Sequence, residues 1–252
     1  MAKNGFGMWL TVGVIGGMAA TAAAGPAGEV LVVEDSFNGL GGIVRGGLEA
    51  AGYTVTEVGA LPVALDGFTQ VWDVRARGAI SDAEEAAFAA YLADGGRMFL
   101  TGENNGQSFR NLTVRQLLEE AGSGQTGVQN TSWSGDQDVT AAGGFVFDYA
   151  SMTFDSSSLW TSVGSGALLT ERSDATGTGS IAGWGVGTLG SALDGAVIAA
   201  LDTNFLFRDH ARTTGDTVAM IAAALDAGGV VPAPGAAMLA GVGLVASARR
   251  RR

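Results

Sequence analysis

Two hydrophobic patterns alternate along much of the chain. Short, mostly apolar runs indicate strands that are buried in a parallel sheet, and longer runs with apolar residues at helical spacing indicate helices. Strands that alternate with helices predict a parallel sheet covered by helices on both faces. We expect strands at residues 29–34, 53–58, 70–74, 97–101 and 196–201, and helices at residues 40–51, 81–93, 109–121 and 216–227.

Local signals mark where these helices begin and end. Ser81 and Glu84 have the spacing of a capping box, in which each side chain bonds the backbone N–H of the other residue. Gly52 and the pair Gly95–Gly96 follow the first two helices, where a glycine ends a helix without steric cost.

Residues 122–195 have a different pattern. Gly, Ser, Thr and Asp dominate, and the apolar segments are short, at residues 145–147, 167–170 and 181–184. We interpret this region as a β-rich insertion that adds to the edge of the sheet and covers it with loops. The domain as a whole is expected to span residues 25–229.

The first 24 residues are typical of a secretory signal peptide. Lys3 supplies a positive start, residues 6–20 are apolar, and Ala22-Ala23-Ala24 supplies small residues for cleavage. We expect the mature chain to begin at Gly25. The alternative is a membrane anchor that stays, because the apolar run is close to the length that spans a bilayer.

Residues 230–252 form a second segment outside the domain. A Pro-rich stretch precedes an apolar run at residues 236–248, and four arginines follow, which would remain on the cytoplasmic side of a membrane. The residues that carry the motif are Val231, Pro232, Ala233, Pro234, Gly235, Arg249, Arg250, Arg251 and Arg252.

This order of features resembles the PEP-CTERM sorting signal of Gram-negative bacteria. Ala233 stands where the name-giving motif has Glu. The resemblance implies an exported protein of the cell envelope or the extracellular space, held by a short transmembrane helix before processing. It also implies an exosortase-type sorting enzyme as partner and a link to exopolysaccharide production. A plain C-terminal membrane anchor is the alternative.

Composition and charge exclude several classes of function. The chain has no cysteine, so disulfides, thiolate metal sites and cysteine nucleophiles are excluded, and one histidine cannot build a multi-histidine zinc site. The formal net charge is −11, and the end segments hold Lys3 and Arg249 to Arg252 but no acidic residue. The body is therefore more acidic than the whole chain, which makes nucleic acid an unfavourable partner.

The stretch from Arg97 to Asn111 indicates a buried strand, a tight turn and the start of a helix. Gly102-Glu103-Asn104-Asn105-Gly106 resembles the Gly-x-Cys-x-Gly elbow of the class I glutamine amidotransferase-like group, and the two glycines predict a sharp turn. The resemblance implies a flavodoxin-like, three-layer α/β fold. Asn104 stands at the position of the nucleophilic cysteine. Because an amide cannot be activated as a thiolate can, the amidotransferase reaction is not available there.

Polar residues follow several of the predicted strands, and parallel strands end at one edge of a sheet. Converging acids there could hold a hard cation or act as an acid/base pair on a sugar. The interpretation we favour is that each acid caps the turn that follows it. We therefore assign no catalytic residue, metal or cofactor. The predicted ligand rim consists of Asp35, Asn38, Glu103, Asn104, Asn105, Asn111, Asp202 and Asn204.

The function that we expect is non-catalytic: an exported structural or binding protein, with polysaccharide as a candidate ligand. Tryptophan side chains at positions 72, 133, 160 and 184 could stack on sugar rings, although Trp72 lies in a predicted core strand. The alternative function is a hydrolase that acts on a carbohydrate or an ester through the carboxylates of the rim.

Overall fold

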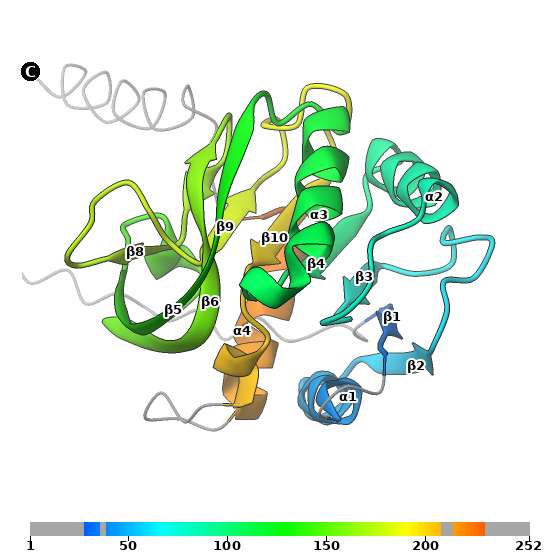
Figure 1. Ribbon diagram of the computed structural model, residues 1–252. Coiled ribbons are helices and arrows are strands. Elements are labelled where there is room, and N and C mark those ends of the chain that lie inside the picture. The colour runs from blue at the N-terminus through cyan, green and yellow to red at the C-terminus, as the bar shows by residue number, and fades with distance from the viewer. Residues whose placement is uncertain (1–27, 36–38, 208–213, 230–252) are drawn as a thin grey trace, which may run out of the picture.

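The computed structural model describes residues 28–35, 39–207 and 214–229 (Figure 1). The predicted signal peptide, the predicted sorting tail with its transmembrane helix, and Asn38 lie outside these residues, so they stay predictions. Within the described residues, no helix combines the length and the apolar character that a membrane crossing requires.

A seven-stranded sheet forms the centre of the molecule, in the order β2-β1-β3-β4-β10-β9-β7. The first five strands in this order run parallel, and the last two run antiparallel to their neighbours. The strands are β1 (Glu29–Val33), β2 (Thr54–Val58), β3 (Gln70–Asp73), β4 (Arg97–Thr101), β7 (Ala167–Leu168), β9 (Ile181–Trp184) and β10 (Ala196–Ala200).

Helices cover both faces of this sheet (Figure 1). The helices α1 (Leu40–Ala50) and α4 (Thr214–Asp226) pack on one face, and α2 (Asp82–Ala93) and α3 (Ser108–Glu120) pack on the other. The predicted strands and helices are thus confirmed, with shifts of a residue or two at their ends.

Alternation within the strands divides the core into two layers. Val30 and Val32 of β1 join the cluster beneath α1 and α4, whereas Leu31 and Val33 join the cluster beneath α2 and α3. This division follows from the strand geometry, which points successive side chains to opposite faces. All four of these valine and leucine side chains are inaccessible to solvent, as a parallel sheet covered on both faces requires.

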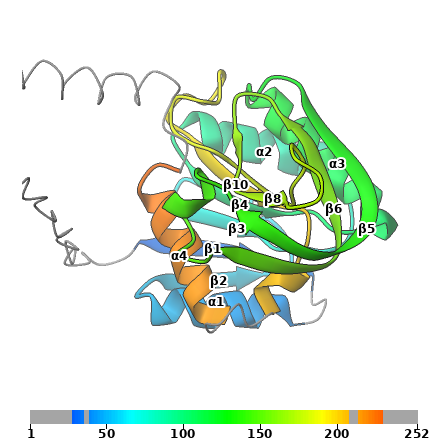
Figure 2. The same ribbon diagram turned by 90° about the vertical axis from the view of Figure 1, so that its left-hand side faces the viewer.

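Residues 122–195 form more than an edge with loops. The strands β7 and β9 extend the main sheet, while β5 (Thr126–Val139), β6 (Ser151–Val163) and β8 (Thr170–Arg172) form a separate antiparallel sheet in the order β6-β5-β8. Figure 2 shows β5 and β6 as long, curved strands beside the main sheet. Phe154 joins the core layer of α1 and α4, and Trp160 joins the layer of α2 and α3. The insertion is therefore part of the core.

Candidate functional site

The candidate site lies where the parallel strands end. Because β1, β3, β4 and β10 run in one direction, the acids that follow three of them, Asp35, Glu103 and Asp202, lie at the same edge of the sheet. This placement agrees with the sequence-based expectation. The contacts of each acid decide what the edge can do.

Asn111 fixes the turn that follows β4. Its Oδ1 accepts a hydrogen bond from the Glu103 N–H at 2.8 Å, and its Nδ2 donates to the Glu103 carbonyl oxygen at 2.7 Å. Nδ2 also lies 2.9 Å from Asn130 Oδ1 and 3.1 Å from Ser158 Oγ. The side chain is fully buried, so it serves as a clamp between the elbow and the insertion rather than as a ligand group on the surface.

Gly102, the first residue of the elbow, has no room for a side chain. A Cβ atom on Gly102 would lie 2.3 Å from Asn111 Oδ1 and 2.7 Å from Leu201 Cδ2, which is closer than packed atoms approach. Neither Gly102 nor Gly106 adopts a positive φ angle. The turn therefore does not use the positive φ that glycine allows, and the close approach of Asn111 and Leu201 is what requires glycine at position 102.

Asn104 has an ordinary backbone conformation, with φ −61° and ψ −179°. Its Oδ1 accepts the Gly106 N–H at 2.8 Å and caps the 3₁₀ turn Asn105–Gln107. A nucleophile elbow instead holds its nucleophile on a strained turn that exposes the side chain. Asn104 is half-buried and serves as a cap, whereas Asn105 is exposed.

Glu103 and Asp202 form the buried part of the rim. Glu103 is 4% exposed, and its Oε2 accepts from the Thr203 hydroxyl at 2.5 Å while Oε1 accepts from the Asn104 N–H at 3.0 Å. Asp202 is inaccessible to solvent, and it accepts the N–H groups of Asn204 at 2.6 Å and Asp155 at 3.0 Å. Each acid thus accepts a hydrogen bond from the backbone that follows it, and Asp202 also accepts one from the distant backbone of β6.

Burial changes the proton affinity of both carboxyl groups. The pKa of Asp202 is raised to about 7, mainly by burial and in part by the negative charge of Glu103, while the hydrogen bonds from the Asp155 and Asn204 N–H groups lower it. Burial also raises the pKa of Glu103, despite the hydrogen bond from Thr203. Glu103 is thus close enough to oppose the ionisation of Asp202.

Hydrogen bonds join this pair to the insertion. Besides the bond between the Asp155 N–H and Asp202, the Asn204 side chain donates to the Asp155 carbonyl oxygen at 3.0 Å. The next residue, Ser156, has a φ of 67°, and within the described residues it is the one non-glycine residue with a positive φ. The end of β10 therefore holds β6 in a conformation that a free strand would avoid.

The centre of the edge is filled by an ion-pair network that sequence reasoning missed. Asp73, at the end of β3, and Arg110 of α3 are both fully buried, with 3.0 Å between their charged atoms. Arg75 contacts Asp73 with two nitrogens, at 2.9 and 2.7 Å, and Glu84 at 2.6 Å. An aspartate within an apolar strand is a signal that could have pointed to a buried cation.

The ion pairs reverse the effect of burial on Asp73. Burial by itself would raise the pKa of Asp73, but the charges and hydrogen bonds of Arg110 and Arg75 outweigh it, so the pKa lies below its usual value. Asp73 therefore stays ionised at neutral pH and acts as the anchor for two guanidinium groups.

The predicted rim thus separates into two parts. Glu103, Asn104, Asn111, Asp202 and Asn204 come together around the ends of β4 and β10. Asp35 lies at the end of β1, on the other side of β3, and accepts a hydrogen bond from the Arg77 N–H at 2.8 Å. Within the described part of the chain, no group of three His, Cys, Asp or Glu residues is arranged to hold a metal ion.

The tryptophans do not form a surface for sugar stacking. Trp72, Trp160 and Trp184 are inaccessible to solvent, and the last two contact each other edge to face with ring centroids 5.6 Å apart. Trp133 is half-buried, and the Arg172 guanidinium lies 4.9 Å from its ring centroid.

Comparison with known proteins reveals similar folds but no sequence family. No protein-family model and no curated protein sequence matches the chain. The structure is similar to the N-terminal domain of mmIFT52, with 12% identity over 81% of this chain and 99% of that one and a TM-score of 0.57. A ThuA-like protein from Parabacteroides merdae has 10% identity over 82% of this chain and 92% of the other, with a TM-score of 0.52.

A third similar structure, of PurLQS from Thermotoga maritima, has 13% identity over 78% of this chain and 97% of that chain, with a TM-score of 0.46. At these identities the likeness concerns the fold alone. The fold is the expected three-layer α/β arrangement, with a mostly parallel sheet and a β-rich insertion, and it is similar to the folds of the mmIFT52 N-terminal domain and the ThuA-like protein.

Proposed function

We propose that this chain is an exported protein with a non-catalytic structural or binding role at the cell envelope or outside the cell. The observation that carries the non-catalytic part is the elbow. Asn104 stands at the nucleophile position with an unstrained backbone and uses its side chain to cap a turn. An amide in that place offers hydrogen bonds but no activated nucleophile.

The neighbouring acids support the same conclusion. Glu103 and Asp202 are almost completely buried, and their oxygens accept hydrogen bonds from the protein itself. Both carboxylates are therefore shielded from solvent. Export and sorting are supported by the signal-peptide pattern of residues 1–24 and by the PEP-CTERM-like order of residues 230–252. These segments make an exosortase-type enzyme and the membrane the expected partners, with polysaccharide as a candidate ligand.

The proposal is tested by following the protein in a Gram-negative host that has an exosortase. We expect the mature chain to begin at Gly25 and deletion of residues 232–252 to change its distribution between membrane and medium. The melting temperature should stay the same, because the last helix of the domain ends at Asp226. Replacement of Arg249 to Arg252 by alanine is the milder variant. An intact Met1, or an unchanged distribution of the truncated chain, would contradict export and sorting.

A hydrolase is the second candidate, and one observation favours it. The pKa of Asp202 is raised to about 7, which suits proton transfer at neutral pH, and Glu103 lies nearby as a second carboxyl group. Aryl glycosides and aryl esters are suitable probes. Hydrolysis that is lost in both Asp202→Asn and Glu103→Gln, while both variants stay folded, would favour the hydrolase over the binding role.

A further inference from the structure

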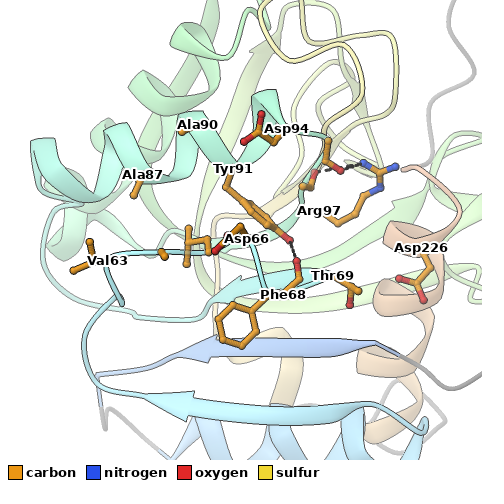
Figure 3. Close-up of a pocket in the computed structure, with 14 residues that line it drawn as sticks. Val63, Asp66, Phe68, Thr69, Ala87, Ala90, Tyr91, Asp94, Arg97 and Asp226 are labelled. Carbon is orange, nitrogen blue, oxygen red and sulfur yellow. Dashed lines mark hydrogen bonds between the residues drawn. The ribbon is translucent and has the colours of Figure 1, made fainter.

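A pocket of about 560 Å³ lies at the N-terminal ends of β3 and β4, the end of the sheet away from the predicted rim (Figure 3). The loop between β2 and β3, the last turns of α2 and the turn before β4 form its walls. A volume of this size is within the range of small-molecule sites.

The walls of the pocket are mostly apolar. Val63, Leu65 and Ala87 contribute aliphatic surface, and Phe68 and Tyr91 contribute aromatic rings. The Tyr91 hydroxyl donates a hydrogen bond to the Phe68 carbonyl oxygen at 3.1 Å, as Figure 3 shows. The Tyr91 ring is therefore held in place before any ligand binds.

Two helices end at this pocket with an acidic residue. Asp94 is the C-cap of α2 and Asp226 is the last residue of α4, and neither helix has a basic residue in its last turn. The C-terminal end of a helix carries a partial negative charge that favours Lys or Arg, so an aspartate there is unfavourable. Asp66 adds a third carboxylate to the lining.

These carboxylates are not neutralised by the protein. The side chains of Asp66 and Asp94 have no hydrogen-bond or ion-pair partner within the described residues, and both residues are exposed. Asp226 accepts hydrogen bonds at 2.6 Å from Tyr53 and from Gln70, which are neutral donors.

Arg97 is the one cation among the residues that line the pocket, and its guanidinium is occupied elsewhere. It donates to the carbonyl oxygens of Gly95, Gly96 and Asp194. In Figure 3 its head group points away from Tyr91 and Asp66. The lining therefore carries three carboxylates against one guanidinium group.

We propose that this pocket binds a small organic cation, with its ammonium group at Asp94 and its apolar body against Tyr91 and Phe68. A carboxylate or phosphate ligand would face three acids and two helix C-termini. A bare metal ion does not fit, because no metal-binding group of three His, Cys, Asp or Glu residues exists within the described chain. This inference does not depend on the function proposed above, since the pocket shares no residue with the rim.

The inference is tested by titrating the full-length protein with three small probes and monitoring each titration by NMR. The probes are phenethylammonium, the neutral 2-phenylethanol and the anionic 3-phenylpropanoate. We expect saturable binding of the cation, binding of the alcohol that is weaker by about tenfold, and no binding of the anion.

Three variants locate the site. Asp94→Asn should weaken cation binding by about fivefold, since it removes one charge at a helix end. Ala90→Phe should abolish binding, because the larger side chain fills the pocket. Asp138→Asn, which removes an exposed charge on β5, is the matched control and should leave binding unchanged. Far-UV circular dichroism and the melting temperature show whether each variant is folded.

Four outcomes would overturn the inference. Equal affinity for the cation and the alcohol would show that charge plays no part, and tighter binding of the anion would show that the sign is wrong. Absence of saturable binding of the cation up to about 10 mM would show that the pocket is not a site for this class. Retained binding in Ala90→Phe would place the ligand elsewhere.

Discussion

Asp73 and Asp202 occupy equivalent places at the two halves of one sheet edge, yet their surroundings shift the pKa values of their carboxyl groups in opposite directions. Both side chains are inaccessible to solvent, and both follow or end a core strand. The pKa of Asp73 is lowered, because two guanidinium groups outweigh burial, whereas the pKa of Asp202 is raised to about 7 by burial and by the charge of Glu103.

The comparison shows that the nearest partner, and not burial alone, decides the charge of a buried acid. At the β3 half, full positive charges compensate the loss of water around Asp73. At the β10 half, Asp202 has two backbone N–H groups and a second acid, so the ionised form is only partly compensated. The first half is a permanent ion-pair network, and the second half can take up a proton.

Removal of Arg110 should produce the largest effect on this comparison. Arg110→Met leaves Asp73 buried with Arg75 as its remaining cation, and we expect the free energy of unfolding to fall by about 3–5 kcal/mol, the usual result of breaking a buried pair. Urea denaturation measures the change.

The matched control for Arg110 is Arg115→Met on the same helix, whose contact with Glu119 at 3.9 Å is partly exposed and should contribute less than about 1 kcal/mol. Adding Asp73→Asn to Arg110→Met should recover part of the lost stability. If Arg110→Met and Arg115→Met cost the same, the ion-pair network does not stabilise the β3 half.

The pH dependence of stability should separate the two aspartates. The folded-state pKa of Asp202, about 7, lies above its usual value of 3.8, so the folded protein holds this proton more tightly than the unfolded chain does. Its contribution is therefore fully present at pH values below the unfolded pKa and is lost as the pH rises toward 7. Asp73 has the opposite sign, since its lowered pKa means that its contribution is lost as the pH falls.

The measurement compares the wild-type protein with Asp202→Asn between pH 4 and pH 8. The free energy of unfolding of the wild type should fall relative to the variant by up to roughly 4 kcal/mol across this range, the linkage value for the shift of Asp202. Asp138→Asn, an exposed position, should show no such trend. A difference between wild type and Asp202→Asn that stays constant with pH would mean that folding does not change the pKa of Asp202.

The sequence predicted the fold well where the residues of a strand or helix were themselves enough to identify it. The parallel strands are continuous apolar runs, and the capping box at Ser81 and Glu84 is present, with Glu84 N–H to Ser81 Oγ and Ser81 N–H to Glu84 Oε2 both formed. The insertion was recognised as β-rich, but its second sheet was not foreseen. Its long strands are rich in Ser, Thr, Gly and Asp, and their hydrophobic contacts with the core, such as Phe154 with Phe205, come from residues far apart in the chain.

The candidate site was predicted in location but not in its contacts. Strand order and direction place Asp35, Glu103 and Asp202 at one edge, and this much follows from the parallel pattern. The clamp of Asn111 on Glu103, the pairing of Asp73 with Arg110 and the link from Asp202 to Asp155 join different elements, so no local spacing reveals them. The pocket at the opposite end of the sheet could not be predicted either, because its acidic residues come from the ends of two helices that are far apart in the sequence.

The smallest expected effect concerns Asn104, the residue at the nucleophile position. Asn104→Ala removes the cap of the turn Asn105–Gln107, and we expect it to lower the free energy of unfolding by about 1 kcal/mol. Asn105→Ala, at the exposed neighbouring position, is the control and should change stability by less than about 0.5 kcal/mol.

The same pair of variants also tests whether the elbow has a nucleophile. An activated ester or a glutamine analogue should give no covalent burst with the wild-type protein, because neither the Asn104 amide nor the buried carboxyl groups of Glu103 and Asp202 can attack it. A burst that is present in the wild type and in Asn105→Ala but absent in Asn104→Ala would require a nucleophilic role for Asn104. The sheet edge would then contain a catalytic centre between the ion-pair network around Asp73 and the proton-binding pair of Glu103 and Asp202.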